Sequence, residues 1–144
     1  MSSHRYRFLP HTTDAYIEAV GSTLEEALEN AGASLIDTMC NLKAVSPKTT
    51  ENIRVNGEND LALLYEWLEA LLLKFEIEQK VYSEFKVKLL RISEGTFGID
   101  AVVSGEEYDR RKHGAKVEVK AVTYHRMEIA RDGAMVVVRF ILDL

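Results

Sequence analysis

Apolar residues recur at helical spacing in two segments, which predicts two amphipathic helices. The first should run from about residue 24 to Cys40, because Thr23 and Glu26 form a capping-box pattern at its start. The second should begin at Asn59 or Asp60, either of which can cap it. Its broad apolar stripe predicts a central helix with a narrow solvent-exposed face, called here the wet face. That stripe comprises Leu61, Leu63, Leu64, Trp67, Leu68, Ala70, Leu71, Leu72 and Phe75, and the wet face Glu66, Glu69 and Lys74.

Alternation of apolar and polar residues predicts strands in much of the remaining chain. Turns are expected at Asn56-Gly57, at 93–95 and at Asp132-Gly133, the last being a strong hairpin signal, with a loop over 41–50. The order is then ββαβα followed by a run of strands. This order predicts a single α+β domain over residues 1–144, with two helices packed on an antiparallel or mixed sheet. The predicted strands cover 5–8, 16–20, 53–55, 84–92, 96–103, 116–123, 127–130 and 134–142.

Composition narrows the function classes. The formal net charge of −5 argues against a protein whose main function is to bind the phosphate backbone of a nucleic acid. Cys40 is the only cysteine, so no intrachain disulfide can form; it is expected to be a small core residue of a cytoplasmic protein. The N-terminal residues have no apolar h-region, and the most apolar segment, 61–75, is too short to span a membrane.

Two aspartates stand at the ends of predicted strands. Asp14 precedes one strand, and Asp143 ends the last apolar run, directly before Leu144 and its α-carboxylate. If the final strand is tied into a sheet, the carboxylates of Asp14, Asp143 and Leu144 could bind one hard cation, which prefers several oxygen ligands. Without a cation they would repel one another. Each aspartate could equally be an ordinary strand-end or turn residue.

Four motifs, in order along the chain, resemble those of the archease family. They are His11-Thr12-Thr13-Asp14 with Gly21 and residues 23–27, the Leu-Leu-Tyr-Glu-Trp-Leu run at 63–68, Gly114 with residues 117–125, and Phe140-Ile141-Leu142-Asp143-Leu144. Thr13 replaces the small apolar residue common in the family, and Ala15 and Tyr16 match it less closely.

The resemblance implies an accessory protein of the RNA-splicing ligase RtcB, which joins RNA ends in tRNA splicing using GTP and manganese. Archeases promote formation of the ligase–GMP intermediate and multiple turnover without being enzymes themselves. The resemblance also implies a metal site at Asp14, Asp143 and Leu144, expected to hold calcium, with manganese or magnesium as alternatives. The protein would contact RNA only through the ligase and would not contact a membrane. The oligomeric state stays open.

Histidines supply further candidates. His11 could line the metal site or orient Asp14, or be a half-exposed strand-end residue. His125 could contact the partner or bond to backbone, while Tyr124 is expected to pack. His4 and His113 are expected to be solvated. Residues 110–113 form a basic cluster, expected to be a solvated loop or else a docking or RNA-facing loop.

Two other function classes compete with the accessory protein. A metal-dependent hydrolase would use the same carboxylates with His11 as general base. A general chaperone-like protein would shield apolar surface, and the balanced composition gives it no specific support.

Overall fold

A computed structural model of the chain describes residues 5–11 and 13–144. The predicted order ββαβα followed by strands is confirmed, and two short helical turns, η1 and α3, are added to it. Thr12 of the first motif, and His4, which was expected to be solvated, lie outside the described residues. The elements are β1 (Tyr6–Leu9), β2 (Ala15–Gly21), α1 (Leu24–Met39), η1 (Leu42–Ala44), β3 (Thr49–Gly57), α2 (Asp60–Glu78), β4 (Lys80–Ser93), β5 (Thr96–Glu107), α3 (Arg110–His113), β6 (Ala121–Asp132) and β7 (Met135–Asp143).

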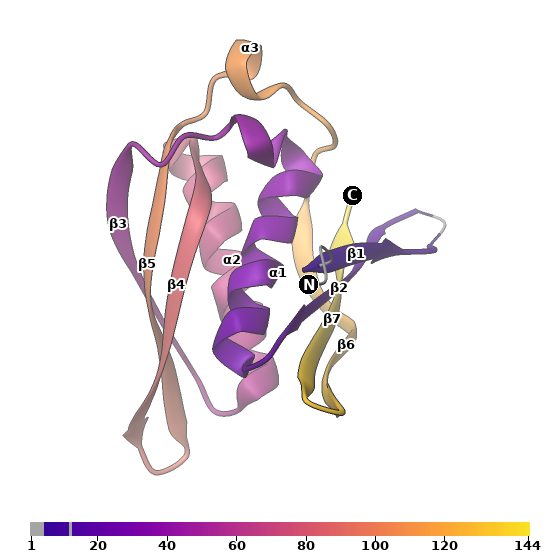
Figure 1. The fold of residues 1–144 in the computed structure, drawn as a ribbon, viewed down its shortest axis with the longest axis vertical. Coiled ribbons are helices and arrows are strands. Elements are labelled where there is room, and N and C mark those ends of the chain that lie inside the picture. The colour runs from indigo at the N-terminus through magenta and orange to yellow at the C-terminus, as the bar shows by residue number, and fades with distance from the viewer. Residues whose placement is uncertain (1–4, 12) are drawn as a thin grey trace.

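Two antiparallel sheets enclose the two long helices (Figure 1). Sheet A has the strand order β1-β2-β7-β6 and sheet B the order β3-β5-β4. Helix α1 packs against β2 and β4, and α2 packs against β3 and β6, so each helix contacts both sheets. The predicted α+β class is therefore confirmed, with two sheets where one was expected.

The core lies between the sheets and around the helices. Trp67 of α2 is fully buried, and its indole N–H donates to the carbonyl oxygen of Leu28 in α1 at 2.8 Å. Removal of such a side chain typically costs about 3–5 kcal/mol. Cys40 is also fully buried, as expected, and burial raises the pKa of its thiol to about 11. A thiol in that environment is protonated and unreactive at neutral pH.

Both helix starts follow the predicted capping chemistry. The Thr23 hydroxyl accepts from the Glu26 N–H at 3.1 Å, while the Glu26 carboxylate accepts from the N–H of Ser22 at 2.7 Å. At the second helix Asn59, not Asp60, is the cap, because its side chain accepts from the Ala62 N–H at 2.9 Å.

The predicted strand over 116–123 is wrong in its first half. Residues up to 120 cross the end of α1, where the Lys116 N–H donates to the Met39 carbonyl oxygen at 2.9 Å. Among the described residues no strand pairs with this segment, so Val119 is buried while Val117 stays 45% exposed. Pairing with β7 begins at Ala121, and the separate strand predicted at 127–130 is part of β6.

The prediction of a turn at Asn56-Gly57 is also wrong, because both residues belong to the nine-residue strand β3. Gly57 is needed for close approach instead. A Cβ at this position would lie 2.9 Å from the Cβ of Ala62 in α2. A glycine that permits close packing and a turn glycine look alike in sequence.

The exposed face of α2 is broader and more apolar than predicted. Leu61, expected to be buried, is 38% exposed, and Leu73 and Ile77 are 41% and 74% exposed. Lys74 is partly covered by its ion pairs with Glu51 and Glu78 at 3.0 Å. The edges of β3 and β6 flank the helix but leave this stripe uncovered.

Candidate metal and docking site

Strand register brings Asp14 and Asp143 to the same end of sheet A. The first residue of β2, Ala15, pairs with Leu142 of β7. Asp14 and Asp143 therefore occupy the next position of the same strand pair. Asp143 also pairs with Ala121 of β6, so it lies centrally among the three strands. The expected tying of the last residues into a sheet is confirmed.

Both aspartates lie beside solvent. Asp143 is exposed, and the Asp14 side chain is 26% exposed. The inner face of β7 is formed by residues such as Phe140 and Leu142, which belong to the core, so alternation puts Asp143 on the outer face. Leu144 packs against the core. We call Asp14, Asp143 and the carboxylate of Leu144 the acidic corner.

The backbone around Asp143 is held on the β6 side as well. The Lys120 N–H donates to the Asp143 carbonyl oxygen at 2.7 Å, one residue before β6 begins. This bond fixes the backbone of Asp143 while leaving its carboxylate free to bind a ligand.

His11 lies next to Asp14. Its Nδ1 is 3.8 Å from the Asp14 carboxylate, and its ring meets the edge of Tyr16 with centroids 6.1 Å apart. The distance is too long for a hydrogen bond. His11 therefore lines the acidic corner, and the structure gives it no bond that would orient Asp14.

The acidic corner offers only hard oxygen ligands. Among the described residues no three His, Cys, Asp or Glu side chains converge to hold a metal ion. Two side-chain carboxylates would thus need a third oxygen from the Leu144 carboxylate, backbone or water. An oxygen-only, partly hydrated set suits Ca²⁺ better than Zn²⁺, which prefers nitrogen and sulfur.

An ion-pair network that the sequence analysis missed crosses the outer face of sheet A. The buried Glu18 carboxylate accepts from Arg7 Nε at 2.7 Å and Arg139 Nε at 2.8 Å, and Arg139 continues to Glu128 at 2.9 Å. The Arg7 hydrogen bond, helped by Arg139 against the opposing effect of burial, lowers the pKa of Glu18. The alternation Ile17-Glu18-Ala19 indicated an outward glutamate, but its partners are distant in sequence. The network fixes the register that forms the acidic corner.

Strand β6 carries an irregularity opposite Phe140. Thr123 pairs with Ile141 and Glu128 with Arg139, so residues 124–127 lie opposite that single residue. Tyr124 stacks on Tyr65 of α2, with ring centroids 4.4 Å apart. The predicted packing of Tyr124 is thus confirmed, although 54% of it remains exposed.

Among the described residues, the His125 side chain makes no hydrogen bond to backbone, which was one of the two roles considered for it. Its own backbone N–H donates to the Thr123 hydroxyl at 3.1 Å, and the residue is exposed. Its imidazole therefore remains available to a partner.

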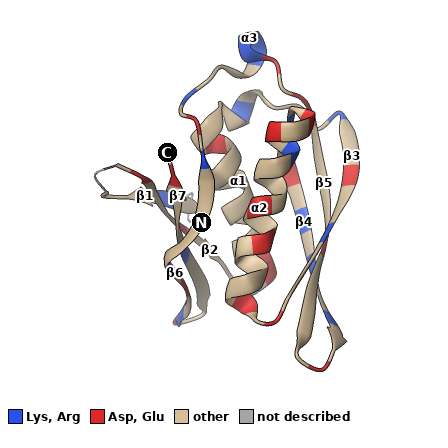
Figure 2. Ribbon diagram, turned by 180° about the vertical axis from the view of Figure 1, so that it is seen from behind, with Lys and Arg blue, Asp and Glu red and all other residues tan. Residues whose placement is uncertain are grey.

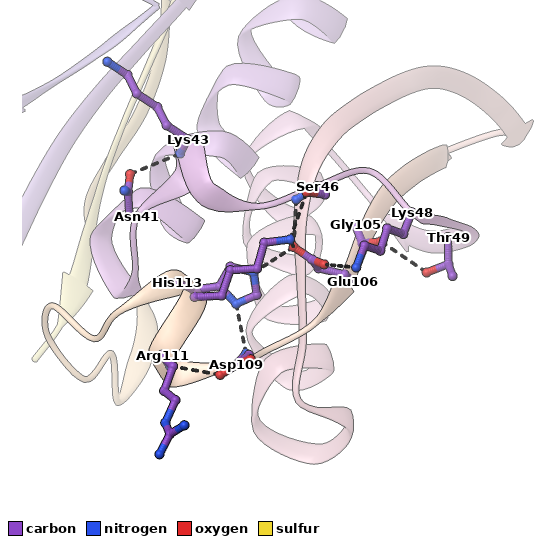
Figure 3. Close-up of polar contacts among 11 residues, drawn as sticks. Asn41, Lys43, Ser46, Lys48, Thr49, Gly105, Glu106, Asp109, Arg111 and His113 are labelled. Carbon is purple, nitrogen blue, oxygen red and sulfur yellow. Dashed lines mark hydrogen bonds and ion pairs between the residues drawn. The ribbon is translucent and has the colours of Figure 1, made fainter.

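A second polar cluster lies at the α3 end of the molecule (Figure 3). Glu106 is 7% exposed, and its carboxylate accepts from Lys112 at 2.7 Å and from the Ser46 N–H and His113 Nε2 at 2.8 Å. Lys48 lies 3.4 Å away. The hydrogen bonds from Lys112, Ser46 and His113 hold the pKa of Glu106 well below its usual range.

The predicted loop over 110–113 is a helical turn, although its basic residues are exposed as expected, and the prediction of a solvated His113 is wrong. Residues 110–113 form the helical turn α3, and His113 is 1% exposed. Its Nδ1 accepts from the Asp109 N–H at 2.9 Å, so the proton is on Nε2 and is donated to Glu106. Arg110 and Arg111 remain exposed and keep this end basic. The sequence offered no signal for the burial, which depends on the bonds to Glu106 and Asp109 and on stacking against Tyr108.

Comparison with known proteins agrees with this architecture. Residues 6–144 match the model of the Archease protein family. The archease of Sulfurisphaera tokodaii is 34% identical over 140 residues, which cover 97% of this chain and 99% of that protein. The archease of Pyrococcus furiosus is 41% identical over 121 residues, 84% of each chain.

Solved structures give the same result. The solution structure of Methanobacterium thermoautotrophicum protein 1598 has a TM-score of 0.80 at 31% identity, covering 97% of this chain and 99% of that one. The crystal structure of a Thermotoga maritima protein, named "archease, possible chaperone", has a TM-score of 0.57 at 19% identity and covers 96% of each chain, which supports the fold alone. In the part of the chain that the structure describes, no helix is long and apolar enough to cross a membrane. The family model and the curated relatives together show that this chain belongs to the archease family.

Proposed function

We propose that this protein is a non-enzymatic accessory protein of the RNA ligase RtcB, acting in the cytoplasm in tRNA splicing and RNA ligation. It docks with the acidic corner toward the mouth of the ligase's active site. There it promotes formation of the ligase–GMP intermediate and sustains multiple turnover. RNA meets the protein only through the ligase.

The observation that carries this proposal is the placement of Asp14 and Asp143 at neighbouring strand ends. The Glu18 network and the Lys120 bond hold those ends, so the carboxylates are presented on rigid backbone. Exposed carboxylates on rigid strand ends suit contact with a cation in a partner better than catalysis within this chain.

Asp14, Asp143 and the Leu144 carboxylate are the residues that would hold a divalent ion, with calcium the best fit and manganese or magnesium as alternatives. Such an ion would neutralise the corner and offer its remaining coordination positions to oxygen ligands of the ligase. The protein's own residues position the carboxylates, while His11 and Tyr16 flank Asp14.

The test is ligase–GMP formation with and without this protein. We expect acceleration by wild type and at least about a tenfold weaker effect for Asp14→Ala and Asp143→Ala, because each removes one of few oxygen ligands. Glu94→Ala is the matched control, since Glu94 is an exposed carboxylate in the β4–β5 turn. Full stimulation by both corner variants would exclude this proposal.

A metal-dependent hydrolase is the second candidate, favoured by one observation: His11, a candidate general base, lies 3.8 Å from Asp14. A hydrolase would release product without any ligase, and His11→Gln would abolish that release. A general chaperone would instead protect unrelated unfolded proteins at stoichiometric ratios. Stimulation that requires the ligase excludes both.

A further inference from the structure

The irregularity in β6 forces an arginine into an unfavourable backbone conformation. Arg126 lies in the four-residue bulge opposite Phe140 and has φ 59°. For a residue with a Cβ, this left-handed conformation costs free energy that glycine would avoid. Bulges are common beside functional sites, where they redirect a side chain.

The bulge directs the guanidinium of Arg126 across sheet A. Its carbon lies 5.8 Å from the centroid of the Tyr16 ring, which belongs to β2, two strands away. Tyr16 in turn contacts His11, which lines the acidic corner. Arg126 therefore lies over the same surface as the corner, and its stacking leaves the N–H groups at the guanidinium edge accessible.

Arg126 differs from the other arginines of this face. Arg7 and Arg139 are both held by Glu18. Within the described residues, Arg126 takes part in no ion pair of this kind. Arg126, which is exposed, is thus the arginine of this face left without a carboxylate.

The neighbouring side chains are those that dominate protein interfaces. Tyr124 is stacked on Tyr65 yet 54% exposed, and His125 is exposed. Tyrosine and arginine are enriched at the centres of protein interfaces because they combine rigid apolar area with hydrogen bonding.

We propose that residues 124–127 form a second docking element beside the acidic corner, in which Arg126 donates paired hydrogen bonds to a carboxylate on the partner protein. This inference rests on the proposed function, since it assumes that a protein docks at the corner. A protein carboxylate is favoured over a nucleic acid because the chain carries net charge −5 and the acidic residues Asp14, Asp143 and Glu128 lie on the same face of sheet A. A polyanion would be repelled there, whereas one carboxylate needs only one guanidinium.

The experiment measures binding of the ligase protein alone, without nucleotide or RNA, to wild type, Arg126→Gly, Arg126→Lys and the control Arg131→Gln. Arg131 is an exposed arginine at the far end of β6. We expect Arg126→Gly to keep or raise the melting temperature but to weaken binding at least about tenfold. Arg126→Lys should recover only part of the affinity, because lysine cannot bind a carboxylate bidentately.

Three results would overturn the inference. Wild-type affinity in Arg126→Gly would show that the guanidinium is not used. A marked fall in its melting temperature would assign Arg126 to covering the sheet. The same measurement is repeated with RNA or nucleotide added, and a loss of affinity seen only there would assign the site to phosphate. If wild type itself does not bind the ligase, the proposed function fails first and this inference with it.

Discussion

At Gly105 the backbones of β4 and β5 come too close for a side chain. A Cβ at this position would lie 2.6 Å from the Cα of Tyr82 and would also collide with the Val81 carbonyl oxygen. The β4–β5 register shifts at this point, between Tyr82 and Glu84. Gly105 thus permits the backbone approach that precedes the buried Glu106.

We expect Gly105→Ala to lower the free energy of unfolding by about 3 kcal/mol, because backbone atoms on the neighbouring strand cannot move aside. Gly95→Ala is the matched control. Gly95 has φ +76° in an open turn, so alanine there should cost only about 1 kcal/mol of backbone strain. Urea titrations of both variants measure the difference, and equal losses would contradict this packing argument.

At the acidic corner, cation binding should stabilise the fold. A ligand at 100 times its dissociation constant adds about 2.7 kcal/mol to folding. For wild type we expect added Ca²⁺ to raise the melting temperature by several degrees, and we expect no rise for Asp143→Asn. Glu94→Gln, which leaves the corner intact, should respond like wild type. An equal rise in all three proteins would place the cation elsewhere.

Among the elements, α3 depends most on one carboxylate. Glu106 joins β5 to α3 through Lys112 and His113, and to the loop before β3 through Ser46. Because these groups lower the pKa of Glu106 below its usual 4.5, its ionised form stabilises the folded state. That contribution is complete above about pH 5.5 and is lost as pH falls below about 4.5.

We therefore expect Glu106→Gln to lower the free energy of unfolding by about 2–3 kcal/mol at neutral pH. Acidification from about pH 6 to about pH 3 should then destabilise this variant less than wild type. Chemical denaturation across this range measures both effects. Parallel pH profiles for the two proteins would show that the Glu106 bonds do not contribute.

Local signals along the chain predict elements where the decisive contacts are also local. Thr23, Glu26 and Asn59 cap their helices through residues at most four positions away. The strand predicted over 116–120 is wrong because alternation shows apolar spacing but not whether a strand is available to pair with the segment. The prediction of a solvated His113 is wrong because its burial depends on Glu106, and no periodicity in the sequence links the two residues.

For the whole molecule, strand pairing between distant segments determines the site. The predicted order, ββαβα followed by strands, does not show that the strands divide into two sheets. That division depends on pairing between strands far apart in sequence, such as β2 with β7. The Asp14–Asp143 juxtaposition depends on that pairing. It could be expected from the family resemblance, whereas Arg126 and Glu18 had no sequence signal that named their partners.

Charge is distributed unevenly over the molecule. Acidic residues lie along α2, and basic residues gather at α3, at the end toward which the C-terminus points (Figure 2). The chain end that contributes to the acidic corner therefore points toward the end of the molecule that carries the basic α3 (Figure 1). A partner docking there would meet both signs of charge, which fixes its orientation better than a uniform field would.

The most direct test of the central claim separates binding to the ligase from stimulation of ligase–GMP formation. Ligase–GMP formation is followed at concentrations of Asp143→Asn that saturate the ligase, with occupancy verified by a binding assay in the same buffer. We expect the bound variant to leave guanylylation near its unassisted rate, because the carboxylate at the active-site mouth is missing. Wild-type stimulation by the fully bound variant would show that docking alone suffices and that the acidic corner is not the acting group.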